Sequence, residues 1–442
     1  MELIDEPARR TQVVAEADVV VLGGGPAGIA AATAASRTGA RTLLLERYGF
    51  LGGMGTAAMV TNFCGLHMQR DGEIVQVVHG IADDLLDRIS RLDGLKEPHA
   101  VLGRTAAQAY DVAAYKCAAD DLLVAAGVAL RFHVLATGCV MDGSRIDALL
   151  IETKSGRGAV RGACFIDCSG DGDLAAWAGA PYEKGDHDGF LAYPTLMFRV
   201  GNVDPERAMA DGRPNLRALM DKAEARGDFR FPRKGVIINA QKHPSEWRCN
   251  VTQIAAGNRA VDATDAEELS AAELEGRRQV RDFFRFLRQD VPGFEQAYLL
   301  EIAPQVGVRE TRRIVGLYQV TGDDVIEGRD FADAIGVNPW PIERHVKGDT
   351  EWRFATGRPY NQLPVRCLIP QAVDNLLVAG RCASATSEGQ SAIRVSGPCF
   401  VMGQAAGTAA ALARRPAALD YTALHRRLAA DGVFFGDPGA SP

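Results

Sequence analysis

The sequence predicts an α/β fold in which a parallel β-sheet is crossed by a β-hairpin and interrupted by an inserted, mixed α+β domain. An apolar run at residues 19–22 breaks into a glycine turn and continues as an alanine-rich helical segment. A strand pattern that ends in a glycine turn recurs at residues 163–173 and 375–381. Because buried parallel strands appear in a sequence as short apolar runs, these three segments predict strands of one sheet.

The glycine turn after residues 19–22 has the spacing Gly-x-Gly-x-x-Gly, at Gly23, Gly25 and Gly28. Gly23 permits the tight turn, Gly25 lets the backbone approach a pyrophosphate, and Gly28 lets helix and strand pack closely. The free N–H groups and the positive dipole end of the following helix favour phosphate charge. In this strand–turn–helix setting the pattern predicts a dinucleotide-binding site.

The second predicted strand, at residues 41–46, ends in Glu46. This carboxylate follows the glycines by about 20 residues, where the dinucleotide pattern places an acid on a ribose hydroxyl. A carboxylate there suits a free 2′-hydroxyl and repels a 2′-phosphate, whereas the alternative is a solvated glutamate at a strand end. The glycine-dense segment at residues 49–55 then predicts a loop whose backbone can lie against a ligand.

Helical and strand patterns continue to residue 180. Apolar residues at helical spacing predict helices at residues 79–92 and 105–126. A strand is expected at residues 129–136, and a hairpin that turns at Asp142-Gly143 joins Val140 to residues 146–152. A short helix at residues 174–178 follows the strand that starts at residue 163.

The composition changes at about residue 181, which predicts an inserted substrate-binding domain at residues 181–354. Strands are expected at residues 193–200 and 235–240. A stretch of mixed polar and aromatic residues is typical of a ligand-facing sheet; it holds Trp247, Arg248, Asn250 and Thr252. Ser270 and Glu273 have the spacing of a capping box and predict the start of a helix that Pro292 and Gly293 end.

The last third of the chain returns to the first domain, which is therefore expected to be discontinuous, at residues 17–180 and 355–433. Ser396 and Pro398 predict the start of a long helix, because proline is favoured in the first turn. Its small residues allow close packing against backbone or a flat ring, and residues 421–430 predict a final helix. Residues 1–16 and 434–442 are expected to be flexible tails.

The overall charge excludes some classes of protein. A net charge of −7 and an isoelectric point near 5.7 disfavour a general nucleic-acid binder or a protein that binds anionic membranes. No apolar run approaches the roughly 20 residues of a membrane-spanning helix. The N-terminal 16 residues lack the apolar core of a signal peptide, so a cytoplasmic location is expected. Nine scattered cysteines without a Cys-x-x-Cys pair predict neither a metal site nor a disulfide framework.

Several segments together resemble the FAD-dependent oxidoreductases of the glutathione-reductase-like flavoprotein superfamily, over about residues 17–433. The resemblance rests on the glycine pattern with Glu46 and on the segments Leu51-Gly-Gly53, 167–173, 307–316, 375–381 and 403–407. It implies a Rossmann-like domain that binds FAD, with the flavin ring near the C-terminal segment. It does not fix a substrate, because members of the family act on diverse compounds.

The resemblance also implies roles for individual residues. The ADP half would lie against Gly23, Gly25, Gly28 and Glu46, with Val134 meeting the adenine through its backbone. Gly170 and Asp171 would close over the pyrophosphate, and Gly380 and Arg381 would approach the ribityl phosphate. The start of the late helix would face the flavin N1–C2=O edge, where its dipole stabilises the anionic reduced ring. The remaining cofactor contacts implied are Pro26, Ala27, Arg47, Gly53, Met54, Pro398, Cys399 and Phe400.

The expected reaction is a hydride transfer from substrate to flavin N5, with a base taking the accompanying proton. No second glycine pattern follows a strand, so the substrate itself is expected to reduce the flavin. The electrons then leave to O2 or to a redox partner. His345 is the first candidate base, ahead of His243 and then His67, although a structural histidine is an equally good interpretation of each.

Arginines and cysteines supply further candidates. Arg394 precedes the late helix and is expected to contact the substrate, because a guanidinium fork suits a carboxylate. Arg309, Arg312 and Arg313 cluster beside Glu310; for Arg312 and Arg313 an internal network is favoured. The cysteines expected near the ring are Cys64 and Cys399, with inert packing favoured over a covalent flavin link.

Two other functions stay open from the sequence. One is a flavin-dependent monooxygenase in a biosynthetic pathway. The other is a non-catalytic, FAD-containing electron-relay or RNA-associated protein, disfavoured by the acidic balance and by the lack of an iron–sulfur cysteine cluster. The leading expectation is oxidation of a small polar metabolite that can carry a carboxylate. A homo-oligomer is compatible with the sequence, and no nucleic-acid or membrane partner is expected.

Overall fold

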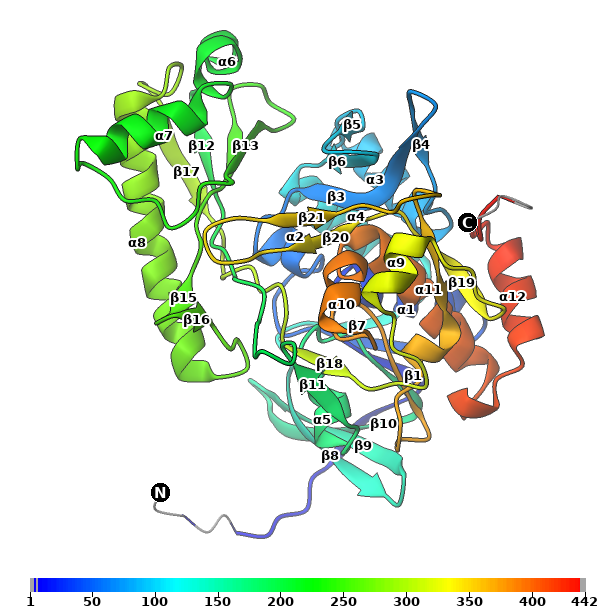
Figure 1. Cartoon of the computed structure of the whole chain (residues 1–442). Coiled ribbons are helices and arrows are strands. Elements are labelled where there is room, and N and C mark those ends of the chain that lie inside the picture. Colours follow the sequence, from blue (N-terminus) through cyan, green and yellow to red (C-terminus); the bar gives the residue numbers. More distant parts are fainter. Residues whose placement is uncertain (1–3, 5–6, 438–442) are drawn as a thin grey trace.

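A seven-stranded sheet gathers the first part of the chain and its last third (Figure 1). The strand order is β7-β2-β1-β10-β9-β8, and β23 pairs with β10. Pairing is parallel among β1 (Val13–Leu22), β2 (Thr42–Leu45), β7 (Ala129–Arg131), β10 (Gly156–Asp167) and β23 (Leu376–Val378). The antiparallel hairpin of β8 (Leu135–Asp142) and β9 (Arg145–Thr153) completes it. The predicted α/β fold with a hairpin crossover is confirmed.

The computed structural model describes residue 4 and residues 7–437, so most of the expected N-terminal tail and part of the C-terminal one can be followed. Strand β1 starts at Val13, which pairs with Ala159, so the sheet begins before residue 17. At the other end, the backbone N–H of Asp437 donates to the Tyr360 hydroxyl at 2.8 Å. Residues 1–3, 5–6 and 438–442 of the two tails lie outside the described residues.

Both faces of the seven-stranded sheet are covered, because its parallel strands are apolar on both sides. One face packs against α1 (Pro26–Arg37), α4 (Val112–Ala125) and α11 (Ser396–Leu412). On the other side, residues of the parallel strands pack with residues of the β8–β9 hairpin and of α5 (Asp173–Trp177). The predicted start of α11 and the predicted bounds of α12 (Tyr421–Ala430) are confirmed.

Helices α1 and α11 touch backbone to backbone. A Cβ placed on Gly403 would lie 2.1 Å from the carbonyl oxygen of Ala27, and one on Gly407 would lie 2.0 Å from that of Ala31. Only glycine fits at such positions, so the small residues of α11 bring its N-terminus to the same region as that of α1. This contact fixes the two helix starts relative to each other.

Two predicted elements of the first domain are wrong. Residues 105–109 form strand β6 (Thr105–Ala109) instead of the first turns of a helix, and α4 starts only at Val112, capped by Asp111. Pairing of β6 with β3 (Asn62–Arg70) overrides the helix preference of its alanines. The strand expected at residues 129–136 is split into β7 and β8, because His133 takes a positive φ of 56° between them.

The inserted domain contains a four-stranded antiparallel sheet of order β13-β14-β12-β17. Its strands are β12 (Phe198–Gly201), β13 (Ile237–Ala240), β14 (Trp247–Asn250) and β17 (Tyr298–Ile302). One face is apolar and packs, through Trp247 and Cys249 among others, against α7 (Leu216–Ala225) and α8 (Ala266–Asp290). Because side chains alternate along a strand, Arg248 and Asn250 project from the opposite face.

The capping box expected at Ser270 and Glu273 is wrong. The N-cap of helix α8 is Asp265, five residues before Ser270, and its side chain accepts the N–H of Glu268. Ser270 lies inside the helix, and its hydroxyl donates to the carbonyl of Ala266 at 2.7 Å. Of the strand expected at residues 193–200, only the end is formed, as β12.

The remaining elements connect and cover these two sheets. The helices are α2 (Met54–Ala57), α3 (Ile81–Arg91), α6 (Pro205–Arg207), α9 (Gly322–Glu327) and α10 (Ser387–Ile393), with turns at η1 (Ala208–Gly212), η2 (Val365–Leu368) and η3 (Pro416–Ala418). The strands are β4 (Glu73–Gln76), β5 (His99–Ala100), β11 (Tyr182–Lys184), β15 (Ala255–Ala256), β16 (Arg259–Ala260), β18 (Arg312–Ile314), β19 (Ala334–Asn338), β20 (Ile342–Arg344), β21 (Glu351–Arg353) and β22 (Asn361–Pro364). Within the described residues, no helix is both long and apolar enough to span a bilayer.

Candidate active site

One cavity of about 270 Å³ is lined by both parts of the molecule. The first domain contributes the glycine turn, the loop before α2 and the start of α11. The inserted domain contributes Asn239, Arg248 and Asn250 from the polar face of its sheet, together with the apolar side chains of Met197 and Ile237. The predicted dinucleotide site and the predicted ligand-facing sheet therefore face the same space.

The glycine turn has the geometry that a bound pyrophosphate requires. Gly23 has a φ of 99°, and a Cβ on Gly28 would lie only 1.8 Å from the Gly23 carbonyl oxygen. A Cβ on Gly25 would meet only Gly53 Cα, at 3.8 Å, so the Gly25 backbone is open to the cavity. Helix α1 has neither a side-chain cap nor an acidic residue in its first turn. Its N–H groups are thus available to phosphate oxygens.

Glu46 lies at the same end of the cavity and is buried. Its Oε2 accepts the N–H of Gly24 at 2.7 Å, and its Oε1 accepts the N–H of Tyr48 at 2.9 Å. Burial raises the pKa of Glu46, and these two N–H contacts oppose the rise. The two hydrogen bonds fix the orientation of the carboxylate. Each oxygen keeps a free lone pair, so the carboxylate can accept both hydroxyls of a ribose diol. The ribose contact itself stays a prediction.

Most of the other predicted cofactor residues also line the cavity: Pro26, Ala27, Arg47, Gly53, Met54, Gly170, Gly380, Arg381 and Cys399. Asp171 lies behind them and binds Arg381 at 2.9 Å. Like Asp171, four other predicted residues are not among the cavity-lining ones: Gly28 packs against the Gly23 carbonyl, and the remaining three contact other parts of the protein. The Val134 N–H donates to the Glu46 carbonyl, Pro398 packs against Gly65, and the Phe400 ring packs against Phe63.

A second helix N-terminus opens into the cavity at the start of α11. Val395, its N-cap residue, provides no side-chain cap, and the first turn has no acidic residue. The Ser396 hydroxyl is instead held between the N–H and the carbonyl of Cys64, at 2.9 and 3.1 Å. The dipole of α11 therefore favours negative charge in the cavity, as the anionic edge of a reduced flavin would supply.

The two cysteines expected near the ring, Cys64 and Cys399, both line this part of the cavity. Burial raises the pKa of each thiol to about 12. Because the thiolate is the nucleophile, protonated thiols favour the inert packing role over a covalent flavin link.

His345 lines the cavity and is buried, and the partly buried Glu343 lies beside it. Its Nε2 lies 3.1 Å from Glu343 Oε1, and its Nδ1 lies 3.2 Å from the Thr350 hydroxyl. Burial, followed by the charge of Arg309, lowers the pKa of His345 well below its ordinary value. Burial opposes ionisation of Glu343, yet contacts from His345 and Trp340 and the charge of Arg394 hold its pKa below the usual range. The pair is therefore a neutral imidazole oriented by a carboxylate.

The other candidate histidines lie elsewhere. His243 is exposed in the turn between β13 and β14 and is not among the cavity-lining residues, so the interpretation of it as a base is wrong. The turn places it at the sheet's edge, whereas β14 carries Arg248 inward. His67 is buried on β3, also away from the lining. Sequence reasoning missed His99, Asn239 and Glu343, which line the cavity; for Asn239 the alternation along β13 was an available signal.

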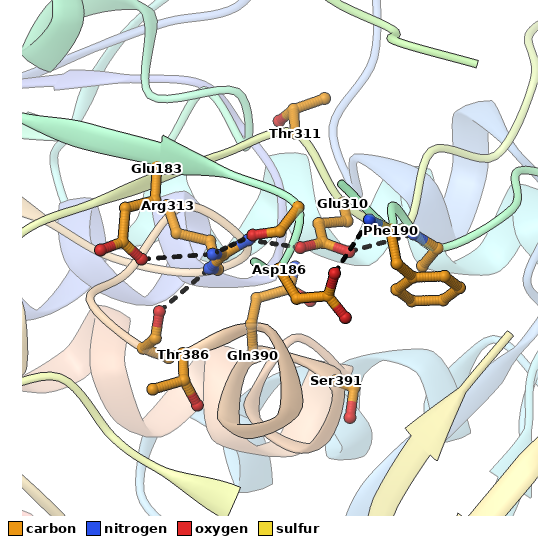
Figure 2. A network of polar contacts seen from close by, with 12 residues as sticks. Glu183, Asp186, Phe190, Glu310, Thr311, Arg313, Thr386, Gln390 and Ser391 are labelled. Atoms are coloured by element: carbon orange, nitrogen blue, oxygen red, sulfur yellow. Dashed lines mark hydrogen bonds and ion pairs between the residues drawn. The ribbon is translucent and has the colours of Figure 1, made fainter. Parts of the chain in front are cut away.

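Arg394 and Arg309 line the cavity, whereas Arg312 and Arg313 do not. Arg312 binds Asp173 at 2.9 Å. Arg313 lies in the buried network of Figure 2, where it donates to Glu310 and Glu183 and to the carbonyl oxygens of Gly185 and Ala385. The predicted internal network is present.

Replacing Arg313 with methionine should lower the free energy of unfolding by about 3–5 kcal/mol, because Glu310 would be left buried without its cation. Urea unfolding of the purified protein measures the change. The exposed pair of Arg217 and Asp221 on α7 gives the control, since Arg217→Met should leave stability nearly unchanged. Equal stability of the two variants would contradict the role of the network.

Comparisons with known proteins give a family. A family model described as FAD dependent oxidoreductase matches residues 18–428. No protein with a curated description matches the sequence. Among solved structures, the chain is similar to a geranylgeranyl bacteriochlorophyll reductase-like protein from Thermoplasma acidophilum, with 14% identity over 94% of this chain and 82% of that one and a TM-score of 0.43. It is also similar to p-nitrophenol 4-monooxygenase from Pseudomonas putida DLL-E4, with 12% identity over 90% and 79% of the two chains and a TM-score of 0.46.

Proposed function

The chain belongs to the FAD-dependent oxidoreductase family, and on that basis we propose that it dehydrogenates a small polar metabolite held against the inserted sheet. One observation supports this most strongly. A single cavity is bordered by two uncapped helix N-termini, by a neutral histidine and by the polar face of a sheet. The two helix N-termini suit FAD, the histidine suits a proton transfer, and the polar sheet face suits a polar substrate.

Bound FAD supplies an acceptor for a hydride. The N–H groups at the start of α1 would hold its pyrophosphate, with Glu46 on the adjacent ribose. The start of α11, which has no side-chain cap, would stabilise negative charge on the ring through its positive dipole end. Arg248 and Asn250 form the opposite wall and orient the substrate.

His345 is the proposed proton acceptor. Glu343 accepts the Nε2–H, which leaves Nδ1 as the basic atom, and its charge stabilises the imidazolium that forms. The Thr350 hydroxyl lies 3.2 Å from Nδ1, so it either gives way or passes the proton on. Arg394, whose Nη2 donates to the Glu343 carbonyl at 3.2 Å, holds this segment against the start of α11.

Anaerobic mixing of the FAD-loaded protein with a library of polar metabolites tests the proposal. A substrate should bleach the long-wavelength flavin absorption band without NADPH, because no second dinucleotide pattern is present in the sequence. Rapid bleaching by NADPH alone would contradict substrate-driven reduction. Aerobic turnover under isotopically labelled O2 then separates peroxide release from oxygen insertion, the outcome expected of a monooxygenase in a biosynthetic pathway.

A further inference from the structure

The inserted domain's end of the cavity holds an excess of buried positive charge. Arg248, Arg309 and Arg394 all line it, and Arg233 lies directly behind Asn250. Arg233, Arg248 and Arg309 are buried and Arg394 is partly buried, and Glu343 is the one carboxylate at this end among the cavity-lining residues. Since His345 is neutral, the positive charges outnumber the negative ones.

These arginines are only partly satisfied by the protein. Arg233 Nε donates to the Gly235 carbonyl at 2.8 Å, and Arg309 Nη1 donates to the Tyr193 carbonyl at 2.5 Å. Asn250 Oδ1 is shared by Arg233 and Arg309, at long distances of 3.4 and 3.5 Å. Arg248 meets the Met197 sulfur at 3.5 Å and the Asn62 carboxamide, and in the described chain no carboxylate forms an ion pair with it. Buried nitrogens without any partner remain on three of the side chains: Arg233 Nη2, Arg248 Nε and Arg394 Nε.

Crowding of these cations has an electrostatic cost. Burial, and then the charge of Arg233, lowers the pKa of Arg309 well below its ordinary range, and burial lowers that of Arg248. A guanidinium does not readily give up its proton, so the cost stays with the charged form. A bound anion would relieve it and would also satisfy the free N–H groups.

We infer that the substrate of this cavity is a dianion, bound through its oxygens by Arg248, Arg309 and Arg394. Dicarboxylates and phosphate monoesters share this chemistry, since both present acceptor oxygens to guanidinium forks. At the inserted domain's end of the cavity, two negative charges match the three lining arginines and the opposing charge of Glu343. The inference rests on the proposed function, because it names the substrate class for the same cavity.

Malonate, a dicarboxylate without an oxidisable C–C pair, tests the inference by binding alone. Calorimetric titration of the FAD-loaded protein should show malonate binding at least about tenfold more tightly than acetate at equal ionic strength. Inorganic phosphate in a parallel titration distinguishes the two dianion types. Equal affinity for malonate, phosphate and acetate, or no binding of either dianion, would overturn the inference.

Matched variants locate the site. Arg248→Met and Arg309→Met should each weaken binding of the preferred dianion at least about tenfold. Arg199 is the control: it is the register partner of Arg248 in β12, but it is ion-paired with Glu246 and Glu301. Arg199→Met should bind within about twofold of the unmodified protein. If Arg248→Met retains FAD and binds the dianion as tightly as the unmodified protein, the proposed site is contradicted. If Arg248→Met does not fold, Arg248→Lys is measured in its place. Malonate binding without any substrate-driven bleaching would instead count against the proposed oxidation.

Discussion

Gly28→Ala is expected to abolish FAD binding and to lower the free energy of unfolding of the apoprotein by about 3 kcal/mol. The added Cβ would lie 1.8 Å from the Gly23 carbonyl oxygen, a distance that no real contact allows. Gly23 cannot move away, because its own φ of 99° and its contact with Cys168 hold the turn. Helix α1 would have to separate from β1, and its N–H groups would leave the pyrophosphate position.

Gly25→Ala separates the cofactor role of the turn from its packing role. Its Cβ would meet only Gly53 Cα, at 3.8 Å, so the apoprotein should unfold at nearly the same urea concentration as the parent. The methyl group would nevertheless occupy the place of a phosphate, so FAD should be lost on desalting. The ratio of flavin to protein absorbance measures retention, and FAD retained by both variants would exclude this turn as the binding site.

His345→Ala is expected to lower turnover by about a hundredfold or more while FAD is retained. The variant removes the proton acceptor but leaves the glycine turn and both helix starts intact. His243→Ala is the matched control, because that exposed histidine lies in the β13–β14 turn and should not affect turnover. Single-turnover flavin reduction measures the effect, and a near-normal rate in His345→Ala would remove the residue from the mechanism.

The pH profile adds a second readout for His345. Its pKa is lowered by burial and by Arg309, so the imidazole is already neutral at pH 7 and able to accept a proton. Activity should therefore stay level as the pH falls through the ordinary histidine value of about 6.5, and should decline only at lower pH. An acid limb centred at or above that ordinary value would contradict a neutral, buried base.

Local constraints explain what could be predicted from the sequence. The turn at Gly23–Gly28, the position of Glu46 and the start of α11 at Ser396 each depend on neighbours close in the chain or on a fixed spacing. The same holds for the β8–β9 hairpin, whose turn residues stand beside its strands.

The failures depend on partners far along the chain. Residues 105–109 became a strand because β3 pairs with them, which their alanines do not indicate. Glu343 was missed although Trp340 and His345 are its neighbours in the sequence, because Arg394, which holds this segment at the cavity, lies 51 residues further along the chain. His243 was predicted to be a catalytic base because it precedes the polar stretch that contains Arg248. It lies in the turn before β14, however, and not on the strand face that carries Arg248 into the cavity.

The close contact of α1 and α11 also bears on how the protein is made. Strand β23 and helix α11 come from the last 70 or so residues, and they complete the sheet at β10 and the wall of the cavity. A nascent chain that has emerged only as far as the inserted domain thus carries the complete glycine turn without the second helix start that faces it. We therefore expect a chain to retain flavin only after the C-terminal third has been synthesised. Retention would also require that the contacts between the first and last parts of the chain have formed.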